Sequence, residues 1–232
     1  MNIRKTLGIA MLLLALFAPP ALAVDGVLEI NQAKVLAGGV NPDDLPGFPV
    51  TIDQPGSYRL TGNLTVPGGL EGLRILADDI TVDLNGFTIA GGGGAIADGI
   101  GIYGTRNIEI RNGTVRGFSR AGVFASAFAT GARVLGVRAL SNFQGLELQG
   151  VGSLVDGCTA VGNSTGIRVL DGGLITNSVA RGNTSFGLLV EANSGYGGNV
   201  VTGNNGGDAN AQIAGTGVQI APNVCGTDAV CP

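Results

Sequence analysis

The sequence predicts an all-β fold in which about seven to eight coils of about 21 residues stack into a parallel β-solenoid. Three observations support this prediction. Glycine is abundant, with 42 copies in 232 residues. Short alternating apolar runs are separated by corners rich in Asn and Gly, and one plan recurs along the chain. No segment beyond the leader shows helical periodicity. A unit of this length cannot bury its own apolar face, so it needs copies above and below it.

Residues 1–23 are typical of a secretory signal peptide. Arg4 and Lys5 form a positive start, an apolar run follows, and a small-residue motif ends at Ala23. The apolar run is shorter than the roughly 20 residues that a membrane helix needs. We therefore expect a secreted or periplasmic protein with no membrane insertion after signal cleavage.

The next segment, residues 24–49, is predicted as an N-terminal cap. It is rich in proline and would shield the open end of the apolar stack, as repeat solenoids require. The β-helix domain is predicted over residues 50–220, beginning with a strand, a Pro-Gly turn and a second strand over 50–67.

The Asn112-Gly113 dipeptide lies between two alternating apolar runs, which by local rules predicts a hairpin turn. An antiparallel sandwich of hairpins is therefore the alternative fold. The same position recurs as Asn or Gly in each following unit, and these residue types enter the left-handed region at least cost. The recurrence favours a bend between two parallel sheets. The aligned residues are Asn112, Gly136, Gly157, Asn177 and Gly198.

A second corner contains an asparagine in four units, each followed by a Gly-apolar-x-apolar element. Stacked side-chain amides can hydrogen-bond along the axis of such a stack. We interpret these residues as a structural ladder and not as ligand-binding groups. They are Asn142, Asn163, Asn183 and Asn204.

The composition excludes several classes of function. The 13 basic and 17 acidic residues form no concentrated basic face of the kind that nucleic acid requires. The absence of histidine removes Ser-His-Asp and Cys-His triads and imidazole metal sites. The sequence predicts no catalytic residue, no metal site and no cofactor, and we expect a monomer.

Candidate binding residues lie at outward positions of the strands that follow the recurring glycines. Glu147 is predicted to neighbour Arg168 in one column, and Glu191 lies further along. An ion-pair ladder, like those expected for Glu109 with Arg133 and Asp83 with Arg111, is favoured over a Ca²⁺ site.

Two other features have a structural and a functional interpretation. Asp78 and Asp79 could form an acid and base pair, but a turn role is favoured. A chain with no Trp is poor in the aromatic faces that sugar-binding grooves present. Phe118, Phe143 and Phe186 fall near corners, where a cover for the core is favoured over an exposed strip.

The three cysteines are expected to meet an oxidising compartment. Cys225 and Cys231 enclose a short polar loop in the C-terminal tail, residues 221–232, and we expect them to form a disulfide. A metal site is the alternative, but two thiolates without histidine are a poor ligand set. Cys158 falls in a core column and is interpreted as a small buried filler.

The segments PGFPVTIDQPGSYRLTGNLTVP, ILADDITVDLNGFTI, IEIRNGTVRGF and NVCGTDAVCP resemble right-handed parallel β-helix, or pectin-lyase-like, proteins in their small secreted bacterial form. The resemblance implies a three-sheeted stack with a disulfide-closed tail. It implies no established activity, although the wider group includes polysaccharide lyases and epimerases. We expect a non-catalytic structural or polysaccharide-contacting protein of the cell surface or periplasm. The alternative is a polysaccharide lyase or epimerase with an atypical site on the outward face of the parallel sheet.

Overall fold

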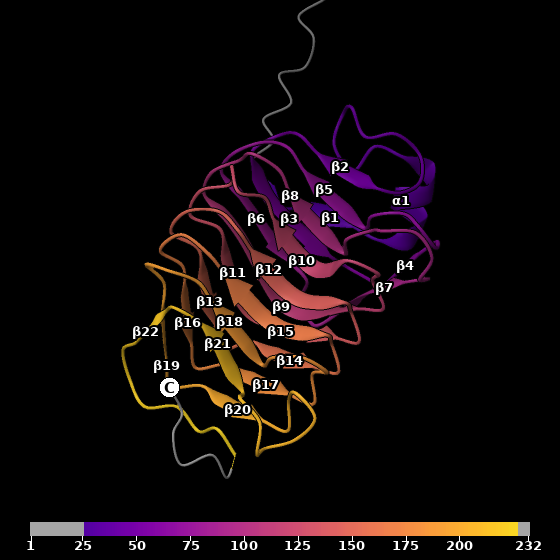
Figure 1. The fold of residues 1–232 in the computed structure, drawn as a ribbon. Coiled ribbons are helices and arrows are strands. Elements are labelled where there is room, and N and C mark those ends of the chain that lie inside the picture. The colour runs from indigo at the N-terminus through magenta and orange to yellow at the C-terminus, as the bar shows by residue number, and fades with distance from the viewer. Residues whose placement is uncertain (1–25, 227–232) are drawn as a thin grey trace, which may run out of the picture.

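The computed structural model describes residues 26–226, which form an elongated stack of about seven turns (Figure 1). All the strand pairings in this part of the chain are parallel, so the alternative antiparallel sandwich is wrong. Each coil contributes strands to three parallel sheets, here called sheets I, II and III. The predicted parallel β-solenoid is confirmed.

Sheet I is an 8-stranded sheet to which each coil contributes one strand. Its strands are β2 (Val50–Ile52), β5 (Leu73–Ile75), β8 (Ile100–Ile102), β10 (Ala121–Ala125), β12 (Gln144–Leu148), β15 (Thr165–Val169), β18 (Leu188–Val190) and β21 (Ile213–Gly215).

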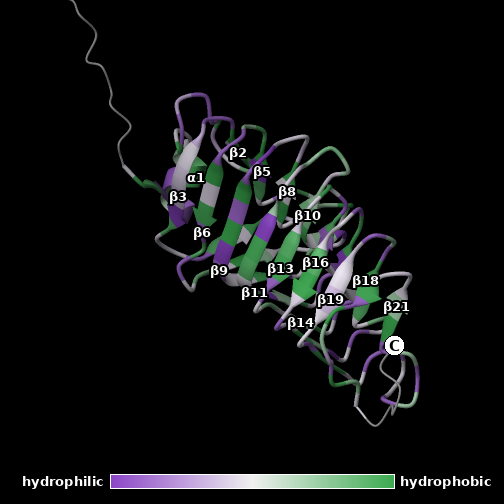
Figure 2. Ribbon diagram, turned by 90° about the vertical axis from the view of Figure 1, so that its left-hand side faces the viewer, coloured by the Kyte–Doolittle hydropathy of each residue, from purple (hydrophilic) through white to green (hydrophobic). Residues whose placement is uncertain are grey.

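Sheet II follows sheet I in each coil and faces the viewer in Figure 2, where hydrophilic residues interrupt the apolar strands β9 and β11. Its strands are β1 (Leu28–Ile30), β3 (Gly56–Leu60), β6 (Ile80–Asp83), the first halves of β9 (Ile108–Arg116) and β11 (Arg133–Leu140), β13 (Leu154–Asp156), β16 (Leu174–Thr176), β19 (Gly195–Gly197) and β22 (Val218–Gln219).

Sheet III completes each coil and is continuous with sheet II through the long strands β9 and β11. Its other strands are β4 (Leu64–Val66), β7 (Thr88–Gly91), β14 (Thr159–Val161), β17 (Val179–Arg181) and β20 (Val200–Thr202).

The bend between sheets II and III occurs at the predicted Asn or Gly column. Asn112 has φ 60° and Gly136 also has φ 60°, and the later members of the column share the left-handed conformation. Gly113 follows the bend because a Cβ there would lie 2.2 Å from the Cβ of Leu84 in the preceding coil. The chain therefore continues forward through Asn112-Gly113, as the recurrence predicts, and does not reverse.

The segment predicted as a cap contributes a strand to the stack. β1 pairs in parallel with β3, so the parallel pairing extends upstream of residue 50. The expectation that helix is absent is also wrong, because α1 (Gln32–Ala37) follows β1. The side chain of Asn31 caps this helix by accepting a hydrogen bond from the amide of Lys34 at 3.0 Å.

The core consists of apolar columns that run along the axis. In sheet II, Ile110, Val134 and Val155 lie in register and are fully buried. In sheet III, Val115 is followed by Ala139 and Ala160. Apolar and other residues alternate along each strand because successive side chains point to opposite faces of the sheet. Burial of each Val or Ile contributes roughly 1.5–3 kcal/mol to the stability of the fold.

The predicted asparagine ladder forms inside the corner between sheets III and I. The Nδ2 of Asn163 donates to the Oδ1 of Asn183 at 3.0 Å, and that of Asn183 donates to Asn204 at 2.8 Å. The ladder ends on Gln212, whose Oε1 accepts from Asn204 at 3.0 Å. These side chains are buried, so their amides satisfy backbone groups that water cannot reach.

Two of the three cysteines, Cys158 and Cys225, lie within the described residues. Cys158 is a buried free thiol in the core, as predicted. Cys225 is buried, whereas its expected partner Cys231 lies outside the described residues, as does the signal peptide of residues 1–23. Within residues 26–226, no helix has the length and apolar character needed to cross a membrane.

Candidate functional site

The outer face of sheet I carries two groups of interacting charged residues. Each sheet I strand buries two side chains and directs the residue between them outward, because side chains alternate along a strand. The registered outward column is Thr51, Arg74, Gly101, Phe124, Glu147, Arg168, Leu189 and Ala214.

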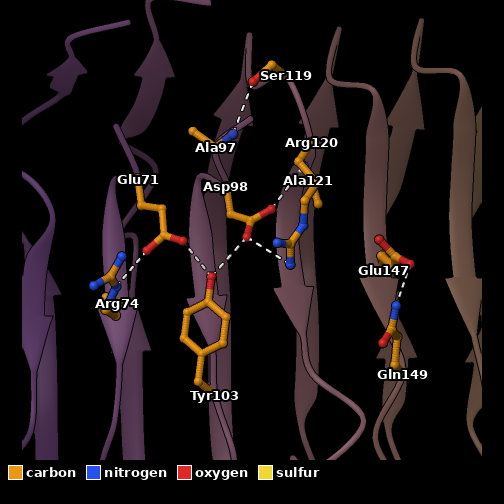
Figure 3. Close-up of polar contacts among 10 residues, drawn as sticks. All are labelled: Glu71, Arg74, Ala97, Asp98, Tyr103, Ser119, Arg120, Ala121, Glu147 and Gln149. Atoms are coloured by element: carbon orange, nitrogen blue, oxygen red, sulfur yellow. Dashed lines mark hydrogen bonds and ion pairs between the residues drawn. The ribbon is translucent and has the colours of Figure 1, made fainter. Parts of the chain in front are cut away.

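Tyr103 lies between two carboxylates at the N-terminal half of this face (Figure 3). Its hydroxyl contacts Glu71 Oε1 at 2.5 Å and Asp98 Oδ2 at 3.1 Å. Its ring covers Gly101, where a Cβ would come 2.5 Å from the ring. The absence of a side chain at Gly101 therefore lets the phenol lie flat on the sheet between the two acids.

Asp98 is the fully buried member of this cluster. Its Oδ1 accepts a hydrogen bond from the amide of Ala121 at 3.1 Å, and its Oδ2 lies 3.2 Å from Arg120 Nη2. Burial raises the pKa of Asp98 to about 6, although Arg120 and the Tyr103 hydroxyl act in the opposite direction. Burial also raises the pKa of Tyr103, and its hydrogen bond to Glu71 adds to the effect. The phenol therefore keeps its proton near neutral pH.

Arg120 and Phe124 close the far side of the cluster. The guanidinium carbon of Arg120 lies 3.6 Å from the centroid of the Phe124 ring, a cation–π contact. The Phe124 ring is in turn 6.0 Å from that of Tyr103. The carboxylate–tyrosine cluster, defined as Glu71, Asp98, Tyr103 and Arg120, is thus fixed by packing as well as by hydrogen bonds.

An open hollow of about 410 Å³ adjoins this cluster. It is lined by Glu71, Arg74, Leu76 and Tyr103. Arg74 pairs with Glu71 at 2.8 Å, and 44% of its side chain is exposed. A ligand in the hollow would therefore meet a cation, a carboxylate and a phenol on one wall.

The structure brings the three predicted binding residues together further along the same face. Arg168 lies 3.1 Å from Glu147 and 3.6 Å from Glu191. Glu191 is not in the outward column, where Leu189 pairs with Arg168, and it reaches back from the turn after β18. Only 8% of the Glu147 side chain is exposed, because Arg168 and Gln149 cover its carboxylate. The ion pair between Glu147 and Arg168 forms as predicted, but the Glu147 carboxylate is largely shielded from solvent.

Two buried polar atoms beside this ion-pair row have no hydrogen-bond partner among the described residues. They are the Oε1 of Gln144, an acceptor, and the Nε of Arg168, a donor. Buried polar groups are normally paired, and an unpaired one costs about 1–3 kcal/mol. Both atoms are shielded from solvent, and they lie three residues apart along the strands, because Gln144 pairs with Thr165 whereas Arg168 pairs with Glu147.

The remaining predicted groups have structural roles. On sheet II, Glu109 pairs with Arg133 at 3.3 Å and Asp83 pairs with Arg111 at 3.2 Å, as expected for an ion-pair ladder. Asp78 accepts a hydrogen bond from the Arg106 amide at 2.8 Å, which supports the turn role.

The exposure of the phenylalanines near the corners and the grouping of possible metal-binding side chains test two further predictions. Phe118 is buried, but Phe143 is 57% exposed, so the core-cover interpretation is wrong for Phe143. Residues 26–226 contain no group of three or more Cys, Asp or Glu side chains placed to hold a metal ion.

The carboxylate–tyrosine cluster is not among the groups predicted from the sequence. Glu71 and Asp98 each directly precede a glycine of the Gly-apolar-x-apolar element, and Leu73 pairs with Ile100, so the two acids are stacked. Alignment of all the glycines in this element would have revealed this column. Tyr103 and Arg120 lie in corners of differing length, where the repeat gives no register.

Comparison with solved structures identifies a similar fold in a larger protein. The A-module of mannuronan C-5 epimerase AlgE4 from Azotobacter vinelandii matches with a TM-score of 0.59 at 16% sequence identity. The match covers 75% of this chain and 62% of that chain. At this identity the likeness shows the fold alone, and it confirms the expected parallel β-helix. No family model and no curated protein matches the sequence.

Proposed function

We propose that this protein is a secreted or periplasmic β-helix that contacts polysaccharide through the outer face of sheet I. The observation that carries the proposal is the open hollow on this face, where Arg74 offers hydrogen-bond donors, Glu71 offers acceptors and Tyr103 offers a hydroxyl. The solved structure of similar fold is named as an enzyme of a polysaccharide, mannuronan, which is compatible with this class of partner.

Sugar hydroxyls both donate and accept hydrogen bonds, so they suit a face that carries both kinds of group. Arg74, Arg120 and Arg168 each lie beside a carboxylate, which leaves the face without a large field of one sign. Paired charges of this kind favour recognition of hydroxyl groups over capture of a strongly charged ligand. They also favour binding without chemical change, because the acids already have partners.

Affinity electrophoresis in gels that contain neutral polysaccharides tests this proposal. We expect retardation of the wild type by at least one polysaccharide and its loss in Arg74→Ala. Arg133→Ala is a matched control because its side chain is 50% exposed, against 44% for Arg74, and each arginine pairs with a glutamate. Equal loss in the two variants, or no retardation of the wild type by any polymer, would contradict a contact on sheet I.

A second candidate function is a uronate lyase or epimerase reaction at the carboxylate–tyrosine cluster. It is favoured by Tyr103, which is held in its protonated form between Glu71 and Asp98 and next to Arg74. Both reactions need a group that removes the proton beside the uronate carboxylate, a cation facing that carboxylate and a proton donor. A phenol could donate the proton, and Glu71 could accept one.

Incubation with mannuronan and polygalacturonate separates the two candidates. The binding function predicts no unsaturated uronate absorbance, no new reducing ends and no change in the proton spectrum of the polymer. If product forms with the wild type and disappears in Tyr103→Phe, the catalytic function replaces the binding one. Alanine replacement of Glu147, Arg168 and Glu191 tests whether the ion-pair row contributes to either.

The proposal also covers the two ends of the chain: export by the signal peptide, a cap on the first coil and a disulfide in the tail. Cleavage after Ala23 would release the mature chain, in which a Cys225–Cys231 disulfide would close the C-terminal tail. Residues 24–49 would cap the first coil, and the protein would act as a monomer. Mass spectrometry of the exported protein, with and without reductant, tests the cleavage site and the disulfide together.

A further inference from the structure

Sheet III carries three arginines on its outer face. Arg116, Arg138 and Arg181 are exposed on its outer face, and none of them forms an ion pair in the described structure. Five other arginines, on or beside sheets I and II, each lie within 3.3 Å of a carboxylate oxygen, whereas Arg59 and Arg106 form no ion pair in the described structure: the five are Arg74, Arg111, Arg120, Arg133 and Arg168.

Acidic residues are absent from the strands of sheet III, counting only the second halves of β9 and β11. Acids lie at both ends of this sheet: Asp83 and Asp156 precede the bends from sheet II, and Asp208 accepts a hydrogen bond from the amide of Gly203, directly after β20. Asp83 is paired with Arg111, and Asp156 is hydrogen-bonded to Thr176 and Asn177. A protein with a formal net charge of −4 therefore presents one face on which the formal charge of the strands is positive only.

The register places the three arginines in two adjacent columns. Arg116, Leu140, Val161 and Arg181 occupy successive strands of one column, which sets the two arginines about 14 Å apart at the strand spacing of about 4.8 Å. Arg138 lies in the next column, between Thr114 and Thr159. Its Nε donates to the Thr114 hydroxyl at 3.0 Å, which orients the guanidinium along the face.

Hydroxyls and one aromatic ring accompany these cations. Thr88 and Thr159 are partly exposed in the Arg138 column, and Thr202 follows Arg181 in its column. Phe143 lies at the corner three residues beyond Leu140 and is 57% exposed. The sheet III strip, defined as Arg116, Arg138, Arg181 and these neighbours, thus combines guanidinium groups that form no ion pair with hydroxyls on one face.

We propose that the sheet III strip binds an acidic polysaccharide, whose carboxylates pair with the three arginines. Guanidinium groups bind carboxylates through two parallel hydrogen bonds, and threonine hydroxyls and the Phe143 ring suit the sugar rings between them. This site is separate from the contact proposed on sheet I, and it does not depend on that contact.

The spacing and number of cations favour a polysaccharide over other polyanions. Nucleic-acid binding sites commonly neutralise six or more phosphates, and anionic membranes attract clusters of about 4–8 basic residues. Three arginines spread over four strands meet neither requirement. A polymer with one carboxylate per sugar matches their sparse placement.

Binding to immobilised polygalacturonate tests the strip. The wild type should bind it and not dextran, with affinity that falls as salt rises because exposed charges are screened. Replacement of Arg116, Arg138 and Arg181 by Gln should lower the affinity at least about tenfold. The matched control replaces Arg59, Arg106 and Arg133 by Gln, which changes the net charge equally on other parts of the surface. It should retain wild-type affinity.

Three results would overturn the proposal: no binding of the wild type, equal loss in both triple variants, or binding to duplex DNA or anionic phospholipid vesicles in place of polygalacturonate. If the sheet III triple variant fails to fold, Arg181→Gln alone is measured, because that side chain makes no hydrogen bond in the described structure. Arg181→Gln should weaken binding, and unchanged affinity would then contradict the proposal. Arg74→Ala should leave polygalacturonate binding intact, which separates failure of this site from failure of the sheet I contact.

Discussion

Replacement of Asn163 by Ala is the most direct perturbation of the interactions that hold the coils together. The Nδ2 of Asn163 donates to Ala139 O at 3.1 Å and to Asn183 Oδ1 at 3.0 Å. Its Oδ1 accepts from the backbone amide and from the side-chain amide of Asn142, at 2.9 and 3.3 Å. The substitution removes these four bonds at a site that is 1% exposed.

The magnitude follows from the number of bonds and from their burial. At about 1 kcal/mol net per hydrogen bond the loss is about 4 kcal/mol, and the Asn142 amide is also left without its partner. We expect the free energy of unfolding to fall by about 3–5 kcal/mol, a large part of the roughly 5–15 kcal/mol that stabilises a typical domain. Asn63→Ala is the control. Asn63 is exposed and its side chain accepts one hydrogen bond, from the Thr88 amide, so we expect a loss of about 1 kcal/mol.

Urea unfolding followed by far-ultraviolet circular dichroism measures both variants. With a urea slope near 2–3 kcal/mol/M, Asn163→Ala should lower the unfolding midpoint by roughly 1.5 M, and Asn63→Ala by much less. A shift in Asn163→Ala no larger than in Asn63→Ala would refute the ladder as a main source of stability. A change in slope would show that the coils no longer unfold together.

Three further predictions concern single residues. Gly145→Ala should destabilise the protein strongly, because the new Cβ would lie 2.3 Å from the carbonyl oxygen of Gly166, whereas Gly62→Ala, with its nearest neighbour at 3.8 Å, should have little effect in the same urea assay. Because the pKa of Asp98 is raised to about 6 in the folded state, its contribution favours folding at low pH and is lost as pH rises. Wild-type stability relative to Asp98→Asn should therefore fall by roughly 2–3 kcal/mol between about pH 4 and pH 6, and a difference that does not vary with pH would contradict this. Burial raises the pKa of Cys158 to about 12, so a thiol reagent at pH 8 should label the unfolded chain and not the native one, and rapid native labelling would contradict the buried position.

The sequence predicts the stack well because its coils share one register. The ladder asparagines and the bend at Asn112 recur at nearly constant intervals, so a physical requirement at one position is visible at several. The helix α1 and the strand β1 precede the regular units and occur once. The parallel pairing of β1 with β3 is not predicted by the repeat pattern.

The candidate site is harder to predict because it interrupts the repeat. Tyr103 reaches Glu71 over Gly101, and this arrangement requires a missing side chain in one coil and a longer corner in another. Glu147 is an outward residue by alternation, yet its carboxylate is covered by Arg168 and Gln149 from neighbouring positions. Strand periodicity predicts the face of the sheet to which a side chain points. The exposure of that side chain depends on whether long neighbouring side chains cover it.

Amide chemical-shift mapping of the isotopically labelled protein with a bound oligosaccharide tests the proposed polysaccharide contact most directly. We expect the largest shifts in β5, β8, β10 and β12 of sheet I, with additional shifts on sheet III for acidic oligomers, while the sugar spectrum stays unchanged over time. Shifts confined to sheet II, or no shifts with any member of the polysaccharide panel, would contradict the account.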